Sequence, residues 1–105
     1  MRRHLFGIFA CAFLVTNHAA ATEFTIKMAG ASYRPASIKA AVGDTIRFVN
    51  DDAAKHNVFV PTAGYALDLG AQEPGQEKVL SVHKVGRFEV ECVIHPHMLT
   101  VVEVE

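Results

Sequence analysis

The chain has 105 residues, the size of one domain, and its ten basic and eleven acidic residues give a formal net charge of −1. This balance gives no sign of nucleic-acid binding, which would need a basic face. Cys11 and Cys92 are the only two thiols, and whether they can pair depends on what happens to the N-terminus.

The first 21 residues have the three-part pattern of a secretory signal peptide. Arg2 and Arg3 supply positive charge, residues 5–15 are almost wholly apolar, and residues 19–21 are three alanines. The apolar run is too short to span a membrane. We therefore expect cleavage after Ala21, export to the periplasm and a single mature domain of residues 22–105. A retained N-terminal anchor is the alternative, and a lipid anchor on Cys11 is disfavoured because few apolar residues precede it.

Removal of this leader would change both the charge and the thiol count. Eight basic residues would then stand against eleven acidic ones, a formal charge of −3, and Cys92 would be the only thiol left. An unpaired cysteine in an oxidising compartment is a liability unless it is buried, paired between chains or bound to a metal. A domain this small also buries little core, so a metal would help to stabilise it.

Short segments of alternating apolar and polar residues run through the mature chain, separated by turn signals. They predict strands at residues 23–28, 37–40, 45–50, 56–60, 78–82, 87–92 and 100–105. Residues 62–76 are rich in Gly, Ala and Pro and are interpreted as a long loop that could include a short helical turn. No segment after the leader has a helical period of useful length. The pattern indicates an all-β sandwich or small barrel without repeats or a second domain.

The most regular alternation ends at Cys92. Phe88, Val90 and Cys92 share one face of their predicted strand, so Cys92 is expected to face the core at the strand's end. His95 and Met98 follow on the connection to the last strand. A loop that joins two strands can direct a thiol, an imidazole and a thioether at one point.

A second imidazole, His56, begins another predicted strand and shares a face with Val58 and Val60. Two histidines, one cysteine and a weakly bound methionine are the ligands of an electron-transfer copper site. Structural zinc sites normally use four strong N or S ligands, and iron–sulfur clusters need several thiolates. The sequence therefore predicts one copper ion held by His56, Cys92, His95 and Met98. The alternative for Met98 is a core side chain that binds no metal.

Two neighbours of these residues are expected to position them. Asn57 follows His56 and could tie its strand to the Cys92 loop, and Pro96 restricts His95 to extended backbone angles. Asp51 and Asp52 are interpreted as a solvated turn, and His83 is interpreted as a surface residue.

The same residues resemble the signature of the blue copper proteins, the cupredoxins, of the amicyanin and plastocyanin type. Residues 86–92 with His95 and Met98 are similar to the family's C-terminal ligand loop in its short form. Upstream, the family's order is matched by Tyr33, Pro35, Val42-Gly43-Asp44, Phe48-Val49-Asn50 and His56-Asn57-Val58. The resemblance implies an eight-stranded Greek-key β-sandwich, copper on the four predicted ligands, and one-electron transfer through the exposed edge of His95.

The expected function is single-electron transfer between periplasmic redox partners of the dehydrogenase or cytochrome type, by a monomer with no enzymatic activity of its own. The partner is expected to dock near His95, where Pro61, Pro96 and Leu69 could form a small apolar rim. His97, beside the ligand loop, is either an ordinary exposed histidine or a group whose charge tunes docking or potential.

Three other functions stay open at this point. The same fold could bind copper for tolerance or delivery rather than for electron flow. Cys92 could be a nucleophile activated by a histidine, although no oxyanion-type glycine or helix N-terminus precedes it. A β-sandwich interaction module without a metal would bind no copper at all.

Overall fold

The computed structural model describes residues 20–105, so the predicted leader falls almost wholly outside the described residues. Within residues 20–105 the chain forms nine strands and no helix. The strands are β1 Glu23–Ala29, β2 Ser32–Arg34, β3 Ser37–Ala40, β4 Thr45–Asn50, β5 His56–Val60, β6 Leu67–Gln72, β7 Glu77–Ser81, β8 Gly86–Glu91 and β9 Leu99–Val104. Nothing in this part of the chain is a helix of the length and apolarity that a membrane span needs.

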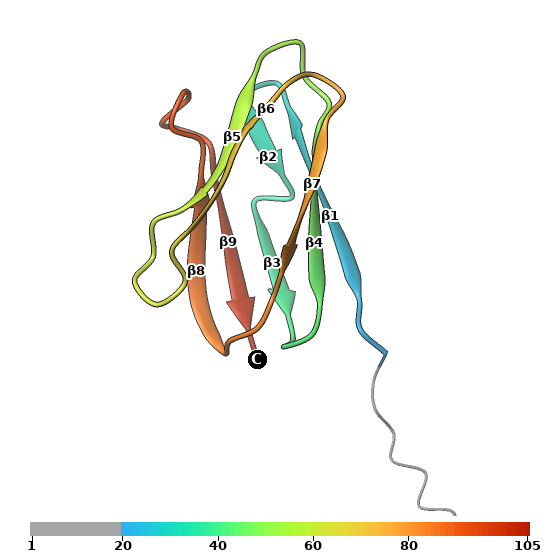
Figure 1. Ribbon diagram of the computed structural model, residues 1–105, viewed down its shortest axis with the longest axis vertical. Coiled ribbons are helices and arrows are strands. Elements are labelled where there is room, and N and C mark those ends of the chain that lie inside the picture. The colour runs from blue at the N-terminus through green and yellow to red at the C-terminus, as the bar shows by residue number, and fades with distance from the viewer. Residues whose placement is uncertain (1–19) are drawn as a thin grey trace, which may run out of the picture.

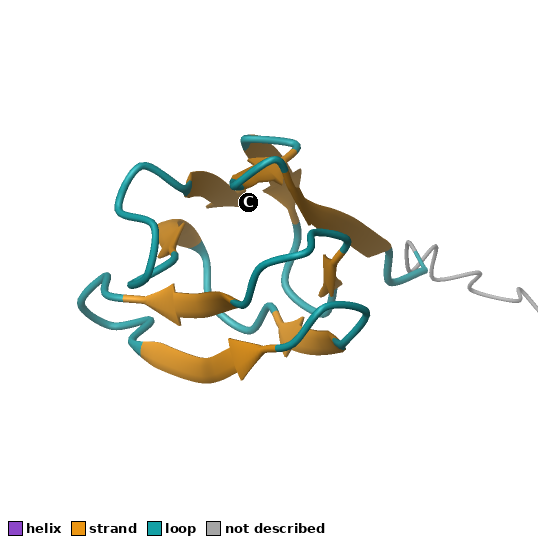
Figure 2. Cartoon of the chain, turned by 90° about the horizontal axis from the view of Figure 1, so that it is seen from above, coloured by secondary structure: helices purple, strands orange, loops and turns teal. Residues whose placement is uncertain are grey.

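The strands form two sheets that face each other (Figures 1 and 2). One sheet has the order β2-β1-β4-β7 and the other the order β3-β9-β8-β5-β6. The pairs β1–β4 and β3–β9 are parallel, and the other pairs are antiparallel. The predicted all-β, cupredoxin-like sandwich is confirmed, with nine strands in the described residues rather than eight.

The sequence interpretation missed two strands, the three-residue β2 and the longer β6. Residues 62–76, which contain β6, were expected to form a loop. Leu67 and Asp68 are exposed, and only Gln72 is buried, so the segment lacks the alternation by which strands are recognised. It is an edge strand that forms by pairing with β5, and the register shifts between Val58 and Phe59. Gly70, at φ +77°, supplies the backbone conformation that such an irregularity requires.

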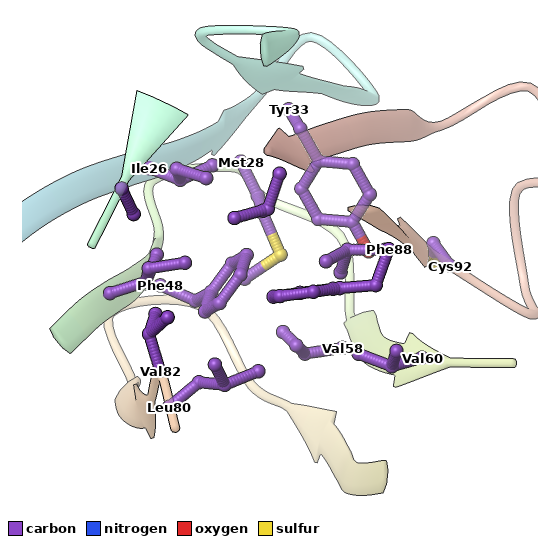
Figure 3. Packing of buried hydrophobic residues seen from close by; sticks show 14 of the residues in the cluster. Ile26, Met28, Tyr33, Phe48, Val58, Val60, Leu80, Val82, Phe88 and Cys92 are labelled. Atoms are coloured by element: carbon purple, nitrogen blue, oxygen red, sulfur yellow. The ribbon is translucent and has the colours of Figure 1, made fainter. Parts of the chain in front are cut away.

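The core lies between the sheets and follows the predicted alternation. Ile26 and Met28 of β1, with Phe48 of β4, face Val58 and Phe88 of the second sheet (Figure 3). Burial of each such side chain contributes about 1.5–3 kcal/mol of transfer free energy. This packing fixes the two sheets relative to each other, and therefore fixes the strand ends that carry the polar residues.

Three strand ends meet at one end of the sandwich. β5 begins at His56, β8 ends at Glu91 just before Cys92, and β9 begins at Leu99 just after Met98. β8 pairs with β9 from Glu91 opposite Leu99, and β8 also pairs with β5. Residues 92–98 therefore form a loop that closes between two neighbouring strands, beside the start of β5 (Figure 1). We call this the metal end of the molecule.

Candidate metal centre

The structure brings the side chains of His56, Cys92 and His95 together at the metal end. The two Nδ1 atoms of His56 and His95 are 3.1 Å apart. The Sγ atom of Cys92 lies 3.9 Å from Nδ1 of His56 and 3.8 Å from Nδ1 of His95. Three donor atoms, one from the start of β5 and two from the loop of residues 92–98, thus form a small triangle.

The size of this triangle fits a metal ion. A point equidistant from the three atoms lies about 2.1 Å from each of them, within the range of about 2.0–2.3 Å at which nitrogen and sulfur ligands bind divalent first-row metals. Two imidazole nitrogens 3.1 Å apart also repel each other unless a proton or a cation lies between them. The donor set, one thiolate and two imidazoles, favours copper.

Asp52 fixes which nitrogen of His56 faces the triangle. Its Oδ2 atom accepts a hydrogen bond from Nε2 of His56 at 2.8 Å and another from the amide of Ala31 at 2.9 Å. Because a carboxylate can only accept, the proton of the neutral imidazole sits on Nε2, and Nδ1 keeps the lone pair that a metal needs. The hydrogen bonds from Ala31, first, and His56, second, lower the pKa of Asp52 to about 2.

The interpretation of Asp52 as part of a solvated turn was therefore wrong. Its carboxylate is a partner of a buried histidine, and its own side chain is only partly exposed. The sequence showed only that a carboxylate stands four residues before a candidate histidine ligand. Metal-binding histidines commonly donate to a carboxylate, but the fold of the turn decides whether Asp52 reaches His56. Asp51 next to it is exposed.

The thiol of Cys92 receives a hydrogen bond from the main chain of β5. The amide of Asn57 donates to Sγ at 3.3 Å, and the hydroxyl of Tyr33 donates to the carbonyl oxygen of the same Asn57. Asn57 does tie its strand to Cys92, as expected, but through its backbone, and its side-chain Oδ1 has no hydrogen-bond partner among the described residues. Burial, and then the nearby charges of Cys92 and Glu91, raise the pKa of Tyr33, which keeps its hydroxyl protonated as a donor.

The predicted ligands differ in their access to solvent. His56 is 0% exposed, and Cys92 and Met98 are each 1% exposed. His95 is only partly buried, and it is the member of the set that reaches the surface. The amide of Met98 donates to the carbonyl oxygen of His95 at 2.9 Å, and this bond closes the loop. The four residues have the arrangement of a type 1 copper site.

The apolar surface beside His95 differs from the one expected. Pro61 follows the end of β5, whereas His56 begins it, so Pro61 lies about 16 Å along the strand from the site. Leu69 packs against the core instead of forming a rim. The exposed apolar residues near the loop are Val93, Ile94 and Leu99, together with Pro96. His97 is exposed, and its ring packs edge-on to that of His95 with centroids 6.2 Å apart.

Comparison with known proteins agrees with this geometry. The model of the cupredoxin-like domain family matches residues 4–102. The methylamine utilization protein MauL of Methylorubrum extorquens is 34% identical over 89 residues, which cover 81% of this chain and 78% of MauL. An amicyanin variant in its Cu(I) form is 30% identical, with a TM-score of 0.73 over 79% of this chain and 82% of amicyanin.

More distant structures share the fold alone. The copper-containing nitrite reductase of Thermus scotoductus is 24% identical with a TM-score of 0.73, and this chain spans only 22% of the reductase chain. A purple cupredoxin from Nitrosopumilus maritimus is 19% identical with a TM-score of 0.70. The match to the family extends over nearly the whole sequence and includes the ligand loop. The chain belongs to the cupredoxin-like domain family.

Proposed function

We propose that His56, Cys92, His95 and Met98 bind one copper ion, and that the protein carries single electrons and does not catalyse a reaction. The observation that carries this proposal is the triangle of Nδ1, Sγ and Nδ1 atoms, whose size fits a bound ion. Copper bound there supplies the one-electron couple between Cu(II) and Cu(I). Cys92 is 1% exposed and has no free face for a substrate, which argues against its use as a nucleophile.

The chain's own residues hold the donor atoms in place. His56 is oriented by Asp52, Cys92 by the Asn57 amide, and both are buried by core packing. A rigid donor set that suits both oxidation states keeps the rearrangement on electron transfer small. His95 gives the electron its route to the surface, because its ring is the ligand that solvent and partner proteins reach.

We place the docking surface around His95, with Val93, Ile94 and Leu99 as its apolar part. Val93 is 62% exposed, Ile94 is 48% exposed and Leu99 is 42% exposed. They group large apolar side chains beside the ligand loop, as interaction sites do. A redox partner of the dehydrogenase or cytochrome type needs only a small contact area for a transient encounter. We also infer that the protein works as a periplasmic monomer, residues 22–105, after removal of a signal peptide.

The visible spectrum of the copper-loaded protein tests the proposal. We expect strong thiolate-to-copper absorption in the wild type and its complete loss in Cys92→Ser, because serine cannot provide the sulfur orbital. Ser37→Ala, on an exposed position of β3, is the matched control and should keep the full spectrum. A wild-type protein that stays colourless after Cu(II) loading would contradict the assignment.

Copper handling is the second candidate, and His97 favours it as a third imidazole beside the metal end. The two functions differ in what leaves the protein. A carrier should be reduced and reoxidised repeatedly with its copper content unchanged, as measured by metal analysis after redox cycling. A delivery protein should lose its copper to an acceptor within the same experiment, and His97→Phe should slow that transfer.

A further inference from the structure

A cavity of about 350 Å³ lies at the end of the sandwich opposite the metal centre. It forms where β6 and β7, the edge strands of the two sheets, separate toward the end at which β8 begins (Figure 1). Core side chains of both sheets form its floor: Val60, Leu80, Val82 and Phe88. Its volume lies within the range of small-molecule binding sites, which are mostly apolar with a few placed polar groups.

One wall of the cavity is held rigidly. The ring of Tyr65 stacks on Phe88 with centroids 5.3 Å apart and planes 26° apart, and its hydroxyl donates to the carbonyl oxygen of Val85. Gly86 leaves room for this contact, since a Cβ atom there would lie 2.0 Å from the Tyr65 hydroxyl. The wall is therefore an aromatic surface whose position is fixed by the contacts of Tyr65 with Phe88 and Val85.

The charge at the cavity is positive. The Nζ atom of Lys84 lies 5.0 Å from the centroid of the Tyr65 ring, and Lys84 makes no ion pair within residues 20–105. His83 is the other ionisable side chain of basic type in the lining, which contains no carboxylate. An apolar chamber with an unpaired ammonium group beside it suits a ligand with a flat apolar body and one negative charge.

We propose that this cavity binds a small aromatic carboxylate, with its ring on the apolar floor next to Tyr65 and its carboxylate at the ammonium group of Lys84. The site uses none of the metal-end residues, so it is independent of the proposed function. A charge-assisted hydrogen bond to Lys84 supplies specificity, and burial of the ring supplies affinity.

The test is a titration of the Cu(I)-loaded protein with benzoate, phenylacetate and 3-phenylpropionate, followed by amide chemical shifts in ¹⁵N-labelled samples. We expect saturable shifts for at least one of these acids at Tyr65, Val82 and Lys84, with the Val93 and His95 amides unmoved. Lys84→Gln should weaken binding by about tenfold, as loss of a charged hydrogen bond implies. Lys55→Gln, an exposed lysine next to His56 at the metal end, is the matched control and should bind as the wild type does.

Neutral 2-phenylethanol has the ring without the negative charge, so it tests the two contributions separately. We expect it to bind about tenfold more weakly than phenylacetate. The proposal is overturned if none of the three acids gives saturable shifts up to about 10 mM, or if the shifts lie at the metal end. It is also overturned if Lys84→Gln or removal of the ligand's charge leaves the affinity unchanged.

Discussion

The two ends of the sandwich differ in the side chains that they bury. The metal end holds four of the buried polar residues, Asn50, His56, Gln72 and Thr100, and the opposite end holds only Asp44 among those in residues 20–105. At the metal end the side-chain amide of Asn50 donates to the carbonyl oxygens of Ala54 and Gln72, and Thr100 donates to that of Pro35. At the opposite end apolar side chains line a cavity.

This difference shows which end is organised for precision. Buried polar groups destabilise a fold unless they are hydrogen-bonded, and when satisfied they allow few alternative arrangements. Apolar packing tolerates a void, whereas a triangle of donor atoms tolerates little displacement. The metal end therefore gains fixed geometry from bonds that add little net stability, and the opposite end contributes stability without comparable precision.

Asp52→Ala should have the largest effect on the metal end. The change removes the acceptor that holds Nε2 of His56 and the acceptor for the Ala31 amide. We expect copper affinity to fall by about 10–100-fold, as for other carboxylates that accept a hydrogen bond from a metal-binding histidine. Competition with a chelator of known affinity measures the loss.

Asp51→Ala is the control for this substitution, because Asp51 is the exposed neighbour on the same turn and the hydrogen bonds to His56 and Ala31 are made by Asp52. It should leave copper affinity within about twofold of the wild type, as expected for a surface change. Equal losses in the two variants would mean that the turn as a whole, rather than the hydrogen bond to His56, supports the site.

A smaller and more selective effect is expected from Tyr33→Phe. The hydroxyl of Tyr33 anchors the carbonyl of Asn57, whose amide donates to Cys92. Without that anchor the hydrogen bond to sulfur weakens, the thiolate donates more strongly to Cu(II), and the reduction potential falls. Voltammetry measures the potential, and thermal unfolding measures a stability loss of about 1 kcal/mol for the missing bond.

Tyr65→Phe provides the matched comparison at the other end. Tyr65 also donates its hydroxyl to a backbone carbonyl, that of Val85, so its loss should destabilise the fold by a similar amount. It should not move the potential or the visible spectrum, since Val85 lies at the end opposite Cys92. A shift of the reduction potential in both variants would show that the two ends are coupled. The opposite end would then not be independent of the copper site.

The sequence predicted the metal end better than the opposite one, for a physical reason. Cys92 and His56 could be placed because strand alternation has a period of two and leaves only one face for each. Asp52 was missed because its role depends on how a turn folds back on His56, which no period encodes. The strand β6 was missed because an edge strand forms by pairing with β5 rather than by its own pattern.

The smallest expected effect concerns the N-terminus and the prediction of cleavage after Ala21. The backbone nitrogen of Thr22 lies 2.8 Å from Oδ1 of Asp44, whose pKa is lowered by hydrogen bonds from Thr22, first, and Ala41. Cleavage after Ala21 would turn that nitrogen into an ammonium group and the hydrogen bond into an ion pair. The ion pair stabilises the fold only while Asp44 is ionised and the ammonium group is protonated, which holds between about pH 4 and pH 8. The stabilisation should fade as pH falls below the usual pKa of an aspartate. It should also fade as pH rises above the usual pKa of an α-amino group.

Thermal unfolding of the protein that begins at Thr22 should show a slightly higher midpoint at pH 6 than the same protein acetylated at Thr22. Asp44→Asn should remove the difference. A difference that persists at pH 10, or in Asp44→Asn, would rule out the ion pair as its cause.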